Sequence, residues 1–425
     1  MPKTVLPLLA IIFMSLLPAC AHADVLYKYR EAPLDDGRYG PVANLQTAMV
    51  AALKACGKNV SPTIDGQFGP ATRWALTLLS ACPEIAPKIA GDAEAVAGTL
   101  TVAYWQALLP DVSPPSVDQR AHTIMLTYEA TDYTVMEWNF CQSKPHYDPK
   151  HGQMRCYSND PRSYLTWGPN GATAGGGQEV RLILQALDKL DANSIDDSFG
   201  TEAAAVRRMF VLRDRDPDRS LETYLCGVWM DAKRRVAWKI GFSKIGAIPA
   251  AREMFDKLYR SASLDGGKVA SFYDAYASNH LVPTEMDYGF FKDRAAHTNV
   301  NSKDHLAIEQ AIQNQLKGLP DSRPWQIRQA IALTVRPGSQ RRDRLGRDVA
   351  FYVDEGEHRL NAEELDAWRA RGRVWASSAG LSDDRMMPSF MPEPTIETDL
   401  SQPSSLTSAE RRACPQAVLD TRKPN

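Results

Sequence analysis

The feature that most constrains this chain is a glycine-rich segment set between two stretches of helical periodicity. The segment reads NDPRSYLTWGPNGATAGGG from Asn159 to Gly177. Before it, apolar residues recur at helical spacing and end at a lone carboxyl, Glu129, and helical spacing returns from Val180 onward. Because glycines and an Asn-Asp-Pro turn interrupt helices, this order predicts a helix, a short β region and a second helix.

Residues 135–157, between Glu129 and that segment, are expected to form a hairpin. They alternate aromatic and polar side chains around a turn-rich stretch, KPHYDPKHG. Cys141 and Cys156 flank the turn. A disulfide that closes so short a loop contributes about 3 kcal/mol if its geometry permits.

The first residues of the chain indicate export. Lys3 is followed by an apolar run and by the small-residue signal Ala21-His22-Ala23, which predicts a signal peptide over residues 1–23. An alternative is a lipoprotein site in the sequence LPAC, with Cys20 acylated, but proline is unusual there and simple cleavage is preferred. No later segment is apolar for long enough to span a bilayer. We expect a periplasmic or extracellular protein without a transmembrane segment.

Six cysteines follow the signal peptide, and exported chains fold in an oxidising compartment. Six cysteines allow fifteen pairings. Two of the pairings are local within apparent structural units, which leaves one long-range pair. We expect three disulfides: Cys56 with Cys82, Cys141 with Cys156, and Cys226 with Cys414.

Length and composition suggest a globular protein of two or three domains. The 425 residues are 24% charged and 44% hydrophobic, and the net charge of −2 gives no overall attraction to nucleic acid. The sequence PDVSPPS from Pro110 to Ser116 breaks the periodicity and is typical of a linker. We predict a helical domain at 24–110, a linker at 111–117, a second helical domain at 118–381 and an extended tail at 382–425.

The N-terminal domain carries a motif between two helical patterns. The sequence IDGQFGPATRWALTLL contains an Asp65-Gly66 turn, an apolar Phe68 and a helix start at Pro70. It resembles the three-helix peptidoglycan-binding-like module, over about residues 40–110 of this chain. The resemblance implies a cell-wall glycan as partner. A helical spacer that packs on its neighbour remains the alternative.

The order of elements from Glu129 onward resembles the lysozyme superfamily, and YLTWGPNGATAGGGQEV is similar to a segment of bacterial chitosanases. Thr166 falls on the family's threonine, and Asp160 and Arg162 fall on its aspartate and arginine, with one extra residue between Asp160 and Thr166. Farther along, DGGKVASFYDAY resembles a second chitosanase segment. The expected fold is therefore mainly α, of the α+β lysozyme-like kind, with a three-helix domain before the catalytic domain.

The resemblance implies roles for three residues. Glu129 would protonate the departing glycosidic oxygen, Asp160 would activate a water molecule, and Thr166 would hold that water. Glu129 would need a partly apolar setting to keep its proton, and Arg162 would favour an ionised Asp160. An inverting enzyme holds its carboxyls roughly 6.5–9.5 Å apart. Residues expected to contact the substrate are Arg162, Tyr164, Trp167, Asp132 and Tyr133.

Several alternatives stay open. Asp132 and Asp148 are rival second carboxylates, and Asp160 also suits a turn before Pro161. His146 and His151 flank Asp148, but no second cluster has metal-ligand spacing, so we expect neither metal nor cofactor. The preferred reaction is hydrolysis of β-1,4 bonds in peptidoglycan. Chitosan hydrolysis, a lytic transglycosylase that uses Glu129 alone, and a noncatalytic wall-binding protein are the alternatives.

The rest of the chain shows mostly helical periodicity. A basic stretch, GSQRRDRLGR from Gly338, interrupts the pattern, and VAFYV from Val349 is consistent with a strand. Residues after about Ser382 are rich in proline, serine and methionine and lack periodicity. They are expected to be extended, with Cys414 tying them back to the domain.

Overall fold

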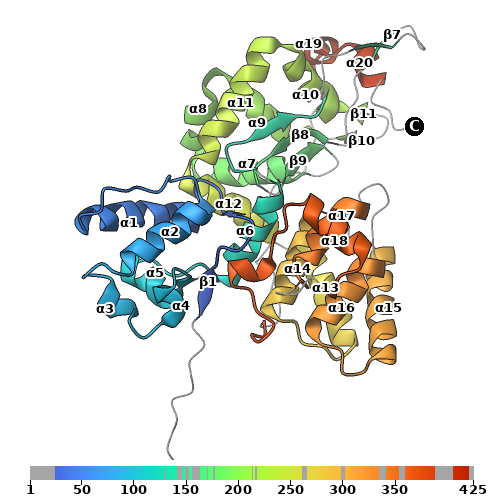
Figure 1. The fold of residues 1–425 in the computed structure, drawn as a ribbon. Helices are drawn as coiled ribbons and strands as arrows, with labels where there is room; N and C mark the ends of the chain where they lie inside the picture. Colours follow the sequence, from blue (N-terminus) through green and yellow to red (C-terminus); the bar gives the residue numbers. More distant parts are fainter. Residues whose placement is uncertain are drawn as a thin grey trace, which may run out of the picture.

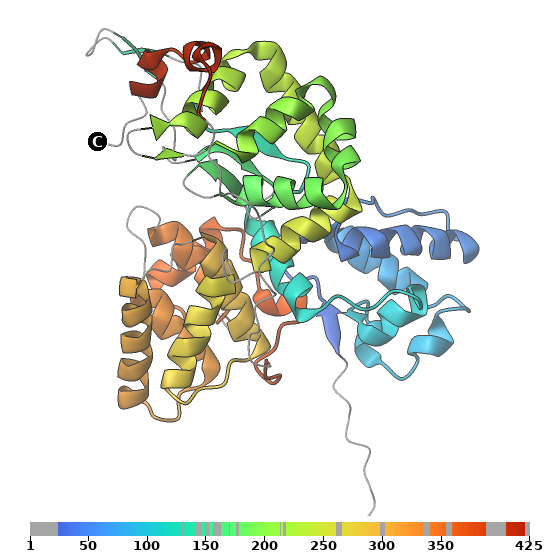
Figure 2. The ribbon, with the colours of Figure 1, turned by 180° about the vertical axis from the view of Figure 1, so that it is seen from behind.

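The computed structural model describes residues 24–129, 131–140, 146–148, 153–155, 163–169, 171–175, 178–212, 214–215, 218–260, 266–297, 302–334, 341–353, 359–387 and 405–420. The predicted signal peptide with Cys20, the Cys141–Cys156 pair, and Asp160 and Arg162 lie outside these residues. The structure is mainly helical with small antiparallel sheets, which confirms the mainly α fold class. Figures 1 and 2 show three bodies around a central helix, α6 (Val117–Glu129).

The first body, the N-terminal module, comprises residues 24–109. Two strand pairs, β1 with β4 and β2 with β3, accompany three main helices and two single-turn ones. The elements are β1 (Val25–Tyr27), β2 (Leu34–Asp35), α1 (Pro41–Ala55), β3 (Gln67–Phe68), α2 (Pro70–Leu79), α3 (Ala86–Ile89), α4 (Ala93–Val96), β4 (Leu100–Thr101) and α5 (Val102–Leu108).

The predicted turn in this module depends on one glutamine of α1. The Gln46 side chain accepts hydrogen bonds from the backbone N–H groups of Asp65 and Gly66, at 3.0 and 2.9 Å. Gly66 has φ +79°, and Phe68 is fully buried against Tyr27. Pro70 begins α2, as expected, because its missing N–H has no helical partner at that position. A disulfide joins Cys56 to Cys82, as predicted.

The second body, the upper lobe, combines residues 131–258 with residues 405–420. Its elements are β5 (Met136–Trp138), β6 (His146–Asp148), β7 (Gln153–Arg155), β8 (Ser163–Trp167), β9 (Ala172–Gly175), α7 (Glu179–Leu190), α8 (Ala192–Phe199), η1 (Gly200–Glu202), α9 (Ala203–Phe210), β10 (Asp214–Arg215), β11 (Asp218–Arg219), α10 (Ser220–Met230), α11 (Ala232–Gly246), α12 (Pro249–Arg260), α19 (Ser408–Ala413) and α20 (Gln416–Asp420). Helix α12 reaches from this lobe toward the centre (Figure 1).

Sheet pairing in the upper lobe differs in part from the predicted hairpin. Strands β6 and β7 pair with each other as the hairpin requires, whereas β5 pairs with β8, and β8 pairs with β9. The three-stranded sheet and its helices share one core, which includes Trp167, Phe242 and Phe255.

The C-terminal residues belong to the core of the upper lobe. Residues 408–420 form α19 and α20, so this part is helical where the sequence suggested an extended tail. Leu406 and Leu419 are buried, and Cys414 forms the predicted disulfide with Cys226 of α10. Both views show these two red helices against the upper lobe (Figures 1 and 2).

The third body, the lower lobe, comprises residues 266–387. Its elements are α13 (Gly266–Ser278), α14 (Glu285–His297), α15 (Ser302–Gly318), α16 (Pro324–Thr334), α17 (Arg341–Val349), α18 (Ala362–Ala370) and η3 (Ala376–Ala379). The predicted strand VAFYV is wrong, because α17 ends at Val349 and a turn follows it.

Helix α6 joins the three bodies. It ends at Glu129, as predicted, and its residues Ala121, Ile124 and Tyr128 belong to a core that extends from the N-terminal module into the lower lobe. The upper lobe has a separate core. Residues 118–381, predicted as one catalytic domain, are thus divided between two lobes that meet at α6. Among the residues that the structure describes, none of the helices combines the length and apolar character needed to cross a bilayer.

Candidate functional site

Glu129 lies at the last residue of α6, where the chain passes toward the upper lobe. Its side chain is 40% exposed, and its carboxylate is paired with the guanidinium of Arg347 on α17. Arg347 is buried, and its Cζ lies 4.9 Å from the centre of the Tyr128 ring. One side of Glu129 therefore faces solvent while a fixed cation holds the other.

Arg347 is itself held by a buried carboxylate. The two terminal nitrogens of its guanidinium group donate hydrogen bonds, one to Glu129 and the other to Asp293 of α14. Burial lowers the pKa of Arg347, but the carboxylates of Asp293 and Glu129 outweigh burial and raise that pKa above its usual range. The arginine remains charged and has a single orientation.

The contacts continue into a network of buried charges. Arg344 pairs with Asp293 and, at 2.8 Å, with Asp348, and Arg294 pairs with Asp348 at 2.9 Å. These four side chains are 0–3% exposed. We call Glu129, Arg347, Asp293, Arg344, Asp348 and Arg294 the charge network. Burying so many ions is expensive unless each is paired, and Glu129 is its exposed member.

The three-stranded sheet presents a polar face near the predicted threonine. Cross-strand pairing places Glu137 and Thr173 beside Thr166, and alternation puts these three on the face opposite Trp167. The Thr166 hydroxyl accepts a hydrogen bond of 2.6 Å from the Asn139 amide. Thr166 is half-buried and Glu137 is exposed. A hydroxyl and a carboxylate therefore lie together on the outer face of the sheet.

Two predicted substrate contacts lie inside the upper lobe instead. Trp167 is 1% exposed, and its indole N–H donates to the Tyr133 carbonyl at 2.6 Å. Tyr164 is 6% exposed and stacks on Phe140 at a centroid distance of 5.8 Å. Their rings pack the protein core, so a sugar has no access to them in this conformation. Strict alternation along β8 would put Tyr164 on the face of Thr166, but the register against β9 shifts between Ser163 and Leu165, so the sequence pattern did not predict the burial of Tyr164.

The other predicted contacts stabilise the junction of the bodies. Asp132 accepts a 2.7 Å hydrogen bond from the backbone N–H of Thr134 and pairs with Arg38 of the N-terminal module at 3.3 Å. The Tyr133 hydroxyl donates to Asp256 of α12 at 2.7 Å. Burial raises the pKa of Tyr133 well above its ordinary value. Both residues act as connectors between elements.

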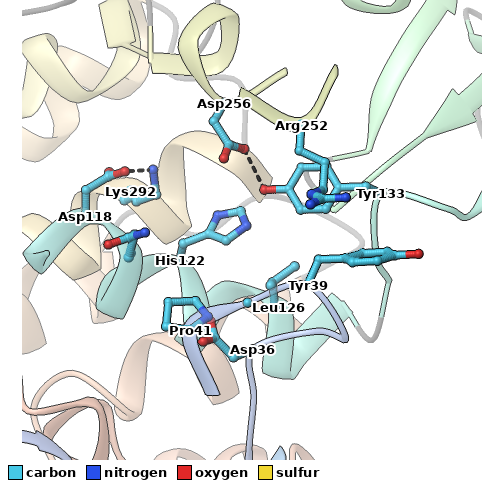
Figure 3. Close-up of a pocket in the computed structure, with 12 residues that line it drawn as sticks. Asp36, Tyr39, Pro41, Asp118, His122, Leu126, Tyr133, Arg252, Asp256 and Lys292 are labelled. Carbon is cyan, nitrogen blue, oxygen red and sulfur yellow. Dashed lines mark hydrogen bonds and ion pairs between the residues drawn. The ribbon is translucent and has the colours of Figure 1, made fainter. Parts of the chain in front are cut away.

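A cavity of about 130 Å³ lies where the three bodies meet. We call it the junction pocket; its walls are Asp36, Tyr39, Gly40, Pro41, Asp118, Gln119, His122, Leu126, Tyr133, Arg252, Asp256 and Lys292. Figure 3 shows His122 between the Asp118–Lys292 ion pair and Tyr133, with Asp36 and Pro41 on the other side. The ion pair measures 2.8 Å. Polar groups in the pocket therefore bind one another across the junction. Within the described ranges, no cluster of histidine, cysteine or carboxylate side chains has the arrangement of a metal site.

Sequence reasoning missed the charge network beside Glu129. Asp293, Arg344 and Arg347 lie more than a hundred positions from Glu129. The basic stretch after Gly338 contains the two arginines but does not indicate which carboxylates they contact. The position of Glu137 across from Thr166 could have been inferred only if the pairing of β5 with β8 had been known.

Comparison of this chain with protein-family models, with curated proteins and with solved structures gave no match.

Proposed function

We propose that this protein is an exported glycoside hydrolase that cleaves β-1,4 bonds of peptidoglycan, with Glu129 as the general acid. The observation that carries the proposal is the exposed Glu129 carboxyl held by the buried charge network. Ions are seldom buried in such number for stability alone, and networks that perturb ionisation are concentrated at functional sites. Here the network fixes one carboxyl that solvent can reach.

In the proposed mechanism, some residues transfer a proton and others hold the reacting groups in place. Glu129 gives its proton to the departing glycosidic oxygen, and Arg347 then stabilises the carboxylate that remains. The Thr166 hydroxyl, oriented by Asn139, holds the attacking water. Asp160 accepts the proton of that water.

Glu137 is a second candidate for the base. It lies directly across from Thr166 in the sheet and is exposed. A carboxylate beside the hydroxyl that holds the water would be placed to deprotonate it. Comparing Asp160→Asn with Glu137→Gln distinguishes the two, since only the base should be required for turnover while substrate binding persists.

Peptidoglycan is favoured over chitosan by the N-terminal module. The Gln46-bound turn and the buried Phe68 give the IDGQFG motif a defined structure next to the start of α2. This is the motif whose resemblance implies a glycan-binding module. The two disulfides, at Cys56–Cys82 and Cys226–Cys414, support an exported protein, because disulfides persist in oxidising compartments.

The test is digestion of purified sacculi and of chitosan by the mature protein, with the products weighed by mass spectrometry. Reducing ends are expected from sacculi, and Glu129→Gln should lower turnover by at least about a hundredfold, the contribution typical of a general acid. Glu309→Gln on α15 is the matched control and should retain full activity. Anhydro products would identify a transglycosylase, and products from chitosan alone would overturn the choice of polymer. Sacculus binding without any cleavage would favour the noncatalytic wall-binding protein.

A further inference from the structure

Helix α11 of the upper lobe departs from the charge balance of the chain. Its sequence, AKRRVAWKIGFSKIG, has five basic residues and no acidic residue, whereas the whole protein has a net charge of −2. Asp231 precedes the helix and caps it by accepting hydrogen bonds from the backbone N–H groups of Lys233 and Arg234. A helix of this composition has a local field that the overall charge does not reveal.

The aromatic residues and the two arginines of α11 contact other parts of the upper lobe. Trp238 and Phe242 are buried in the core of the upper lobe. Arg234 pairs with Glu202 at 3.0 Å, and Arg235 donates to the Trp229 carbonyl at 3.1 Å. The two arginines are therefore engaged within the protein.

The outer face of α11 carries the remaining charges. Lys233, Lys239 and Lys244 are exposed, and no carboxylate of the described residues pairs with them. Val236 and Ile240 lie among them at i, i+4 spacing and are 55% and 51% exposed. The outer face is thus two aliphatic side chains surrounded by three free ammonium groups, along a helix about 22 Å long.

We propose that the outer face of α11 docks on membrane surfaces that contain anionic phospholipids. Ammonium groups are attracted to anionic headgroups, and aliphatic side chains gain free energy when they enter the boundary of the acyl chains. A soluble polyanion would satisfy the lysines but would leave Val236 and Ile240 in water. The exposed aliphatic pair therefore selects a lipid surface. This inference is independent of the proposed glycosidase activity.

The test is co-sedimentation of the full mature protein with phosphatidylcholine vesicles, with and without phosphatidylglycerol. Binding is expected only to the anionic vesicles and should weaken as salt is raised. Replacing the three lysines by glutamine should lower partitioning on the order of a hundredfold, and Ile240→Ser should lower it several-fold. The matched control replaces Lys54, Lys58 and Lys317, all exposed on other bodies, by glutamine and should bind normally.

Three outcomes would overturn the proposal. These are absence of binding to anionic vesicles, an equal loss in the control triple variant, and binding that Ile240→Ser leaves unchanged while soluble polyphosphate competes for it. The last result would identify the face as a site for soluble polyanions. Circular dichroism of each variant separates loss of docking from loss of folding.

Discussion

At the scale of single residues, Asp36 shows how a carboxyl can be held in an apolar junction. It is 4% exposed, and its two oxygens accept hydrogen bonds from the Thr123 hydroxyl at 2.7 Å and the Val42 N–H at 3.0 Å. These bonds tie the start of α1 to α6. Burial raises the pKa of Asp36 from 3.8 to about 7, even though both hydrogen bonds oppose the rise.

This raised pKa predicts the direction of a pH effect on stability. Between pH 3.8 and about 7, the folded protein holds a proton on Asp36 that the unfolded chain has already released. The contribution is therefore fully present below the unfolded pKa and is lost as pH rises through the folded pKa, by about 4 kcal/mol. Urea unfolding across this window should show wild type losing more stability than Asp36→Asn. The exposed Asp111→Asn variant should follow wild type, and parallel curves for wild type and Asp36→Asn would contradict the assignment.

Gly66 supports a second prediction at this scale. Its φ of +79° is unfavourable for other residues, and a Cβ added there would lie 2.0 Å from the Gly37 carbonyl oxygen. Gly66→Ala should lower the free energy of unfolding by about 1–3 kcal/mol or more. Gly91→Ala, where a Cβ meets nothing within 4 Å, is the matched control and should change stability little. Thermal denaturation of both variants measures the difference.

At the scale of elements, α17 explains why part of the fold escaped prediction. Its sequence, RRDRLGRDV, shows almost no apolar periodicity, yet its buried residues include Arg344, Arg347 and Asp348. The helix is buried through ion pairs with other helices, so the pattern that indicates burial in other helices is missing. The missing apolar pattern explains both incorrect expectations, the interruption of the helical pattern after Gly338 and the strand from Val349.

Elements stabilised by local chemistry could be predicted. The end of α6 at Glu129, the start of α2 at Pro70 and the Cys56–Cys82 bond needed only caps, periodicity and cysteine spacing. The long-range Cys226–Cys414 bond was predicted as the pair that the two local pairings left over. Pairing between strands or helices far apart in the chain could not be predicted. A single sequence does not show which strand pairs with a given strand edge, or which residue pairs with a given charge. Hence the position of Glu129 at the end of a helix was predicted, whereas its contact with Arg347 and the contact of Thr166 with Asn139 were not.

The charge network gives a prediction for α17. Arg347→Met leaves the buried Asp293 without one of its cations and frees Glu129, so unfolding should become easier by about 3–5 kcal/mol. Arg342→Met on the same helix removes an exposed ion pair with Asp366 and should cost less than about 1 kcal/mol. Denaturant unfolding of the two variants measures the contrast. Equal, small losses would show that the network contributes little.

At the scale of the whole molecule, the bodies are joined by contacts between distant parts of the chain. The N-terminal module and the lower lobe share one core through α6, and residues 405–420 complete the upper lobe. Arg208 of α9 pairs with Glu410 of α19 at 2.9 Å, and the Cys226–Cys414 bond joins α10 to the C-terminal end of α19. Linear domain boundaries drawn along the sequence could not capture such an arrangement.

The C-terminal contacts predict a local effect of reduction. Cys226→Ala with Cys414→Ala should destabilise the protein by about 2–5 kcal/mol and expose residues 405–420 to protease before the rest. Limited proteolysis followed by mass spectrometry identifies the first cuts. Replacing Cys56 and Cys82 instead should direct early cleavage to the N-terminal module. Identical cleavage patterns for both double variants would show that the bonds do not act locally.

The Cys226–Cys414 bond also bears on how the chain must mature. Its two cysteines are 188 positions apart in the sequence, so Cys226 is synthesised long before Cys414. Until Cys414 has been made, Cys226 is a free thiol that can react with the other cysteines. Oxidation that is too fast would trap Cys226 in a non-native disulfide. Correct assembly of the upper lobe therefore depends on the timing of oxidation, and a disulfide isomerase should raise the yield of native protein far more than an oxidant alone.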